Sequence, residues 1–183
     1  FLTHFHSDHI DGLGELMLQR WAGGAWATPL PVYGPTGVDQ VVQGFEAAYA
    51  LDRGYRIAHH GPKVVPPTGF GGAPQPFAPG PQDTVLIDDG GLRVTAFPVR
   101  HAPAEPAVGY RFDYKGRSAV ISGDTAPSPR LEAAARGVDL LVHEGRPVPA
   151  DRLIDDLWGS ELPGNPSGTL SAKVSQLRRA FED

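Results

Sequence analysis

A cluster of three histidines and one aspartate near the start of the chain constrains its fold more than any other feature. His4, His6, Asp8 and His9 fall within six residues, in the pattern His-x-His-x-Asp-His. In extended backbone successive side chains alternate, so His4 and His6 are expected to project to the same side. The chain is then expected to turn into a helix that starts near Ile10, so that two pairs of polar side chains face one pocket. We favour this arrangement over a solvated histidine-rich turn.

Three more polar residues each follow a predicted strand. They are His101 after residues 92–99, Asp124 after residues 117–122, and His143 after residues 138–142. Sites in layered α/β folds gather at the carboxyl ends of strands, so the repeated placement favours ligands over structural residues. A turn aspartate is the alternative for Asp124. His143 and Glu144 are either a solvated pair or a proton donor with its orienting carboxylate, and the sequence leaves both open.

Hydrophobic periodicity predicts a mixed α/β chain. Helices are expected at residues 10–21, 37–51, 131–136, 151–158 and 170–183, and strands at 31–33, 84–87, 92–99, 108–114, 117–122 and 138–142. The strands between 84 and 122 should form an antiparallel meander that includes a two-residue hairpin at Lys115-Gly116. The last strand is nearly continuous in apolar residues, which is typical of a buried strand.

Glycine and proline mark the longest predicted loop. The chain has 23 glycines and 19 prolines, and seven prolines and five glycines fall within residues 59–81. These residues predict one long irregular loop there. Loops of this length inside a domain usually serve as lids or binding segments. It is a candidate substrate lid, and His59 and His60 within it are expected to be exposed to solvent.

Composition excludes several kinds of site. With no cysteine, the chain has no disulfide, iron–sulfur cluster, thiolate zinc site or cysteine nucleophile. Histidine and carboxylate ligands suit Zn²⁺, with iron or manganese as lesser options. Two such ions need a bridging ligand, for which Asp124 is the natural candidate. The net charge of -5 and only three lysines argue against a nucleic-acid footprint. No apolar run approaches the roughly 20 residues of a membrane span.

The order of these motifs resembles the metallo-β-lactamase superfamily. The His-x-His-x-Asp-His pattern is followed by His101 and then by Gly109-Tyr110-Arg111-Phe112. Two further motifs, Ser122-Gly123-Asp124-Thr125 and the run 139–145, narrow the resemblance to the ribonuclease Z and arylsulfatase-like branch. The match extends from Phe1 to about residue 145.

The resemblance implies an αββα sandwich with two zinc ions at the edge of its sheets. It implies a first metal bound by His4, His6 and His101, a second bound by Asp8 and His9, and a bridge at Asp124. Asp8 would also orient the attacking hydroxide. His143 and Glu144 match a pair that assists proton donation to the leaving group.

The sequence also departs from the family pattern. No histidine follows His143, so the family's final metal-ligand histidine has no counterpart here. The opening strands of the fold would precede Phe1, and residues 151–183 match weakly. We therefore expect residues 1–183 to form a single, incomplete domain truncated at both ends.

These features predict a metal-dependent hydrolase. The leading expectation is a dinuclear-zinc enzyme that uses a metal-bound hydroxide on a phosphodiester, sulfate ester or similar anionic small-molecule ester. A ribonuclease Z that processes tRNA 3′ ends ranks behind it, because the Lys115-Gly116 hairpin closes the space where many bacterial forms carry a basic arm for tRNA. A truncated, non-catalytic metal-binding domain is a further alternative. No membrane partner is expected, a homodimer stays open, and a cytoplasmic location is a default.

Overall fold

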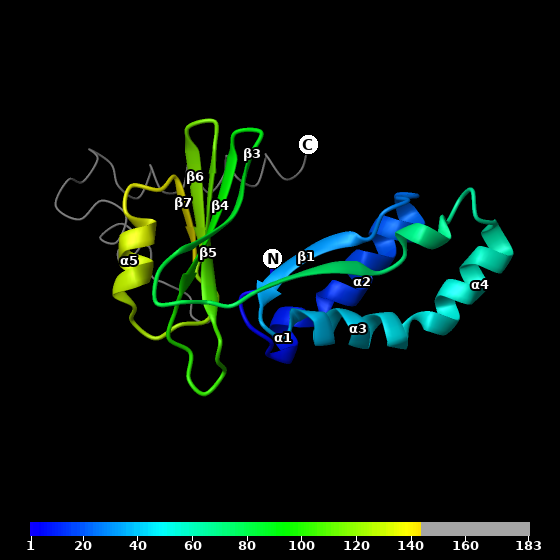
Figure 1. Cartoon of the computed structure of the whole chain (residues 1–183), viewed down its shortest axis with the longest axis horizontal. Coiled ribbons are helices and arrows are strands. Elements are labelled where there is room, and N and C mark those ends of the chain that lie inside the picture. Colours follow the sequence, from blue (N-terminus) through cyan, green and yellow to red (C-terminus); the bar gives the residue numbers. More distant parts are fainter. Residues whose placement is uncertain (144–183) are drawn as a thin grey trace, which may run out of the picture. The chain divides into compact units, whose positions relative to one another are not determined.

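The computed structural model describes residues 1–143, which divide into two compact units. Unit 1 comprises Phe1–Ala78 with Ala104–Pro106, and unit 2 comprises Pro79–Pro103 with the described residues from Ala107 onward. Each unit mixes helices with strands (Figure 1). The helices predicted at 151–158 and 170–183 lie outside the described residues, as does Glu144. None of the described helices is both long and apolar enough to span a membrane.

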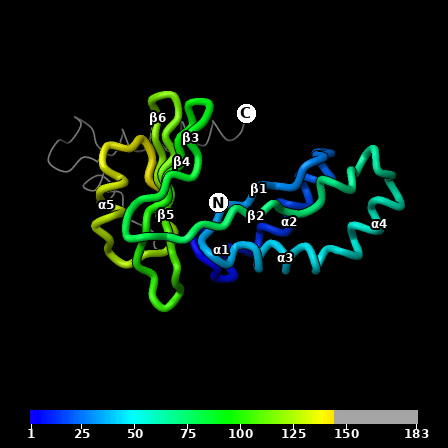
Figure 2. The backbone as a smooth tube through the Cα atoms, viewed as in Figure 1, coloured from blue at the N-terminus to red at the C-terminus, as the bar shows by residue number. Residues whose placement is uncertain are grey.

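Unit 1 packs helices beside a two-stranded parallel sheet. Its elements are α1 (Ser7–Ile10), α2 (Gly12–Leu18), the π-helix η1 (Gln19–Gly23), β1 (Leu30–Pro35), α3 (Val38–Ala48), α4 (Ala50–His60), the 3-10 helix η2 (Pro67–Gly69) and β2 (Gly72–Phe77). The chain leaves α4 and returns alongside β1 as β2 (Figure 2), with Leu30 opposite Gly72 and Pro35 opposite Phe77. Helix α3 confirms most of the predicted helix at 37–51, whereas α4 was not predicted.

The predicted irregular loop at residues 59–81 is wrong in two places. Helix α4 continues through His60, and β2 occupies residues 72–77. Proline lacks an N–H, but Pro74 and Pro76 are two residues apart, so their nitrogens lie on the same side of the strand. The N–H groups of the residues between and beside these prolines point to the other side, where they can pair with β1. An edge strand tolerates proline in this way, because its unpaired side needs no N–H donor. His59 and His60 are exposed, as predicted.

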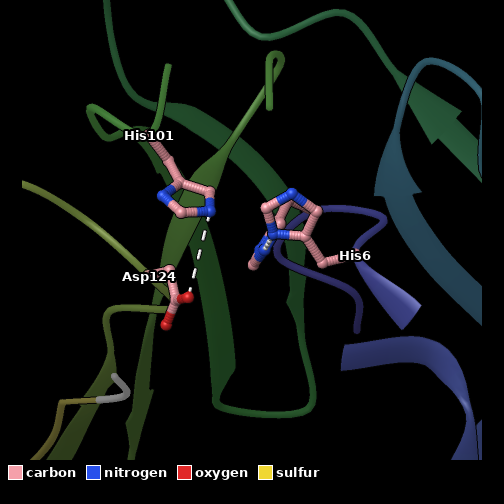
Figure 3. A group of neighbouring side chains, drawn as sticks. His6, His101 and Asp124 are labelled. Carbon is pink, nitrogen blue, oxygen red and sulfur yellow. Dashed lines mark hydrogen bonds and ion pairs between the residues drawn. The ribbon is translucent and has the colours of Figure 1, made fainter. Parts of the chain in front are cut away.

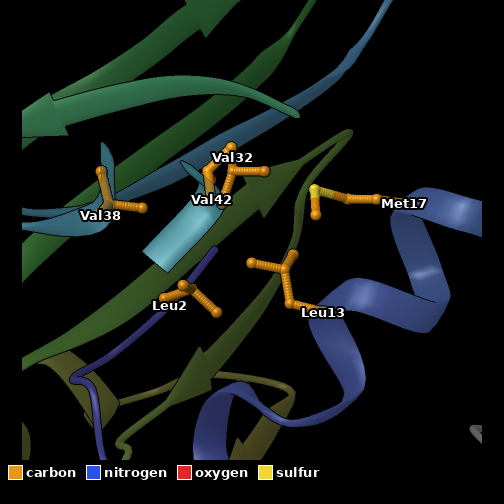
Figure 4. Packing of buried hydrophobic residues seen from close by; sticks show 6 residues of the cluster. All are labelled: Leu2, Leu13, Met17, Val32, Val38 and Val42. Atoms are coloured by element: carbon orange, nitrogen blue, oxygen red, sulfur yellow. The ribbon is translucent and has the colours of Figure 1, made fainter. Parts of the chain in front are cut away.

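The core of unit 1 fixes the start of the chain. Its buried cluster is Leu2, Leu13, Met17, Val32, Val38 and Val42 (Figure 4). The four-residue spacing of Leu13 with Met17 places both on one face of α2. The backbone N–H of Leu2 donates to the carbonyl of Tyr33 at 2.8 Å. The segment that carries the first histidines is therefore held against β1.

Unit 2 is a five-stranded sheet with one helix. Its elements are β3 (Thr84–Asp89), β4 (Leu92–Pro98), β5 (Val108–Tyr114), β6 (Arg117–Ile121), α5 (Pro129–Ala135) and β7 (Leu140–Val142), and the strands lie in the order β3-β4-β5-β6-β7. Strands β3 to β6 pair antiparallel, which confirms the predicted meander. Lys115 and Gly116 both have positive φ, at 48° and 77°, as a type I′ hairpin turn requires.

The last part of unit 2 is a β6–α5–β7 crossover. Strand β7 pairs parallel with β6, and α5 connects the two. Ser128 caps α5 as predicted, its hydroxyl accepting from the N–H of Leu131. The core is Phe97, Val99, Ala107, Val120, Ala135 and Val138, against which Leu131 and Ala134 of α5 pack. The strand predicted at 138–142 is shorter, at Leu140–Val142, and the prediction that it is buried is wrong at its end, where Val142 is 38% exposed.

Candidate metal centre

His4 and His6 face one another in unit 1. Nε2 of His4 lies 3.0 Å from Nδ1 of His6, which confirms that the two side chains project to the same side. The backbone of His6 is extended, with φ -63° and ψ 148°, and α1 begins directly after it. His4 is buried, and its other nitrogen, Nδ1, lies 3.2 Å from the hydroxyl of Thr3. A metal-ligating histidine characteristically donates its second N–H to such an outer partner, which fixes the ring.

Asp8 and His9 lie in α1, which starts three residues earlier than predicted. The helix begins at Ser7, so its first turn includes Asp8, and an acidic side chain is favoured near a helix N-terminus. The ring of His9 lies 4.2 Å from that of His4, centroid to centroid. The Asp8 side chain is 78% exposed, and its Oδ2 lies 3.6 Å from His9 Nε2. Unit 1 thus gathers the three histidines, while the ligand roles of Asp8 and His9 stay predictions.

His101 and Asp124 meet at one edge of the sheet in unit 2. Strands β4 and β6 both run antiparallel to β5, so their carboxyl ends share an edge. Nε2 of His101 lies 3.9 Å from Oδ2 of Asp124 (Figure 3), and both side chains are about three-quarters buried. The backbone of Arg100 ties the two loops together, since its carbonyl accepts from Ala126 N–H at 2.7 Å and its N–H donates to Thr125 Oγ1 at 3.1 Å.

The turn after β6 contains a contact that sequence reasoning missed. Gly123 has φ +58°, a left-handed conformation that favours glycine and lets the chain turn immediately before Asp124. Ser122 is completely buried, and its Oγ lies 2.7 Å from Nδ1 of His143. The only sequence signal for Ser122 is its place in the Ser-Gly-Asp-Thr motif. The predicted role of the His143 and Glu144 pair stays a prediction, because Glu144 lies outside the described residues.

The donor chemistry of both units suits a metal ion. His4 and His6 in unit 1 and His101 and Asp124 in unit 2 each offer one nitrogen or oxygen atom that could hold a metal. Imidazole nitrogen and carboxylate oxygen are ligands that Zn²⁺ accepts, and manganese and iron accept them as well. The residues of each unit therefore fit a metal ion by their chemistry.

Comparison with known proteins identifies the family. The family model described as a beta-lactamase superfamily domain matches residues 1–175. The chain belongs to this superfamily. The match confirms the predicted resemblance and the predicted mixed α/β fold class.

Two curated relatives within the superfamily are named ribonucleases Z. The chain is 38% identical over 144 residues to a putative ribonuclease Z of Mycobacterium tuberculosis (strain CDC 1551 / Oshkosh), which covers 78% of this chain and 61% of that protein. It is 39% identical over 145 residues to a ribonuclease Z of Mycobacterium marinum, covering 78% of this chain and 49% of the relative. The chain thus spans about half to three-fifths of the length of these relatives.

A solved structure supports the superfamily fold. The crystal structure of human tRNase Z, short form, superposes with a TM-score of 0.58 and 22% sequence identity, covering 97% of this chain and 68% of that one. At this identity the likeness concerns the fold alone. It agrees with the mixed sheet and helix elements described above.

Proposed function

We propose that this chain belongs to a metal-dependent endoribonuclease of the ribonuclease Z type, which cleaves a phosphodiester bond in tRNA precursors. The observation that carries the proposal is the 38% identity to a putative ribonuclease Z over 144 residues. The named relatives favour this alternative over the small-molecule or arylsulfatase-like ester hydrolase, which the missing basic arm and the net charge ranked first.

The proposal assigns a ligand role to each candidate residue, as the resemblance to the family implies. The first ion would be bound by His4, His6 and His101, the second by Asp8 and His9, and Asp124 would bridge them. Zinc is the favoured metal because the donors are nitrogen and oxygen and no cysteine is present. When bound, such ions polarise a phosphoryl oxygen and lower the pKa of a coordinated water.

The chain's own side chains would prepare the site for a phosphodiester. With its proton on Nδ1, His4 would donate a hydrogen bond to the Thr3 hydroxyl 3.2 Å away, and its Nε2 would present a lone pair to a metal ion. The carboxylate of Asp8, which is largely exposed, would accept a hydrogen bond from an attacking water. His143, beyond the end of β7, would hold the proton that the leaving oxygen takes up.

Electrostatics give the proposal a measurable signature. A chain with a net charge of -5 does not attract RNA by its overall field, so binding has to depend on local cationic groups. Each phosphate contact releases counterions, and affinity then falls steeply as salt rises. Cleavage of a tRNA precursor below saturation should therefore be several-fold faster at about 50 mM than at about 200 mM monovalent salt.

The test is cleavage of a 3′-extended tRNA precursor by the zinc-loaded protein, followed on a sequencing gel. We expect one endonucleolytic product near the 3′ end, and at least a 100-fold loss of rate in Asp124→Ala. The control is His59→Ala, which removes an exposed histidine of α4 and should leave the rate unchanged. Hydrolysis of an aryl sulfate without cleavage of the precursor would contradict the proposal.

A further inference from the structure

Ser122 makes two short contacts through a single hydroxyl oxygen. Its Oγ lies 2.6 Å from the backbone carbonyl oxygen of Gly123 and 2.7 Å from Nδ1 of His143. The side chain is completely buried at the end of β6, and the His143 side chain is half-buried. Both distances are in the range of strong hydrogen bonds, so the protons have to be distributed to satisfy both.

The two contacts determine which group donates. A carbonyl oxygen can only accept, and a serine hydroxyl has one proton to donate. If that proton pointed to His143, two oxygen atoms would lie 2.6 Å apart with no proton between them. The hydroxyl therefore donates to Gly123, and its lone pair accepts a proton from Nδ1 of His143. A neutral His143 then carries its proton on Nδ1 and leaves Nε2 unprotonated.

The backbone holds this pair in register. Strands β6 and β7 are parallel, with Ile121 opposite Val142, so Ser122 and His143 follow directly after paired residues. The N–H of Ser122 donates to the carbonyl of Val142 at 2.9 Å, which continues the ladder by one step. The serine is thus fixed by the sheet, and the imidazole is oriented by the serine.

We propose that Ser122 is a positioning residue that sets the tautomer and the orientation of His143, so that Nε2 is the atom that exchanges protons with the substrate. The catalytic consequence rests on the proposed hydrolytic function. The tautomer itself does not, because it follows from the hydrogen bonds within unit 2. Ser122 acts through His143 and need not touch the substrate.

The direct test is an NMR spectrum of the protein labelled with ¹⁵N at its histidines, recorded about one pH unit or more above the ordinary histidine pKa of about 6.5. Long-range ¹⁵N–¹H correlations distinguish protonated from unprotonated ring nitrogens. The spectrum of His143→Gln identifies the His143 signals among the seven histidines. We expect a protonated Nδ1 in the native protein and in Ser122→Thr, and a mixture of tautomers in Ser122→Ala. A native protein with the proton on Nε2 overturns the inference.

Kinetics provide a second readout of the same contact. Ser122→Ala should lower kcat by about 10-fold with little change in KM, because general acid–base catalysis contributes about 100-fold or more and a His143 in mixed tautomers keeps only part of it. Ser122→Thr, which keeps the hydroxyl, should restore most of the rate. Ser118→Ala is the matched control, because it removes a hydroxyl from β6, the strand that leads into Ser122, and this hydroxyl contacts Asp139 and not His143.

The two readouts separate failure of the inference from failure of the proposed function. A protonated Nδ1 in a protein that cleaves no precursor leaves the inference standing and rejects the proposed function. Cleavage of the precursor by a protein whose His143 is protonated on Nε2 rejects the inference about Ser122 and leaves the proposed function standing. The native spectrum needs no variant other than the one used for assignment, so poor folding of Ser122→Ala does not prevent the test.

Discussion

Gly109 and Phe97 lie opposite one another in the β4/β5 pair, and the ring of Phe97 covers the glycine. A methyl group added at Gly109 would meet Cζ of Phe97 at 2.4 Å and Cε2 at 2.6 Å, with the carbonyl of Ile121 at 3.1 Å. Phe97 is 1% exposed and belongs to the core of unit 2, so its ring is enclosed by other side chains. Gly109→Ala therefore overpacks the core of unit 2.

We expect Gly109→Ala to reduce the free energy of unfolding by about 2 kcal/mol, within the usual range of about 1–3 kcal/mol for overpacking. That change raises the unfolding equilibrium constant about 30-fold. The measurement is urea-induced unfolding followed by far-UV circular dichroism. Gly54→Ala is the control, because that exposed glycine in α4 has no atom within 4 Å of an added methyl, and alanine should stabilise the helix by up to about 1 kcal/mol.

A double-mutant cycle tests whether Phe97 is the cause. Phe97→Leu alone should cost about 1 kcal/mol through a cavity, but in the Gly109→Ala background it also removes the clash. The double variant should therefore be more stable than the sum of the single effects predicts, by about 1 kcal/mol or more. Additive effects, or a Gly109→Ala protein as stable as the native one, would refute the reasoning.

Three further predictions concern single buried or capping residues. Ser128→Ala removes the cap of α5 and should lower the free energy of unfolding by about 1 kcal/mol, measured by urea unfolding; no change would show that the cap is dispensable. Trp21→Phe removes the bond from the indole N–H to the Pro66 carbonyl and should cost about 2 kcal/mol, whereas a smaller loss than that of Ser128→Ala would argue against a buried partner. Burial raises the pKa of Tyr110 above its ordinary value of 10.0, so the folded state keeps a proton that the unfolded state loses, and stability should fall as pH rises above about 10. Tyr110→Phe should remove that part of the pH dependence in thermal unfolding curves, and an unchanged slope would contradict the assignment.

The sheet of unit 2 was predictable because its signals are local. Period-two alternation and the Lys115-Gly116 turn act within a few residues, and β5 has the predicted bounds of 108–114. The projection of the His4 and His6 side chains to the same side follows from the same alternation along extended backbone. Local rules of this kind do not depend on distant parts of the chain.

Other features depend on partners that are distant in sequence. Strand β2 contains two prolines and reads as a loop until β1 is available to pair with it. The early start of α1 at Ser7 was hidden because His6 provides no recognisable side-chain cap. The contact of Ser122 with His143 joins residues 21 positions apart, and no local pattern marks it.

Zinc affinity in variants of His6 and His101 tests the central proposal, that both residues are metal ligands. Zinc content after equilibrium dialysis and competitive titration is compared for His6→Ala, His101→Ala, the double variant and the control His59→Ala. We expect each single substitution to lower the zinc affinity, the double variant to bind zinc no more tightly than either single variant, and His59→Ala to leave the affinity unchanged. Unchanged zinc binding in either single variant would contradict the proposal.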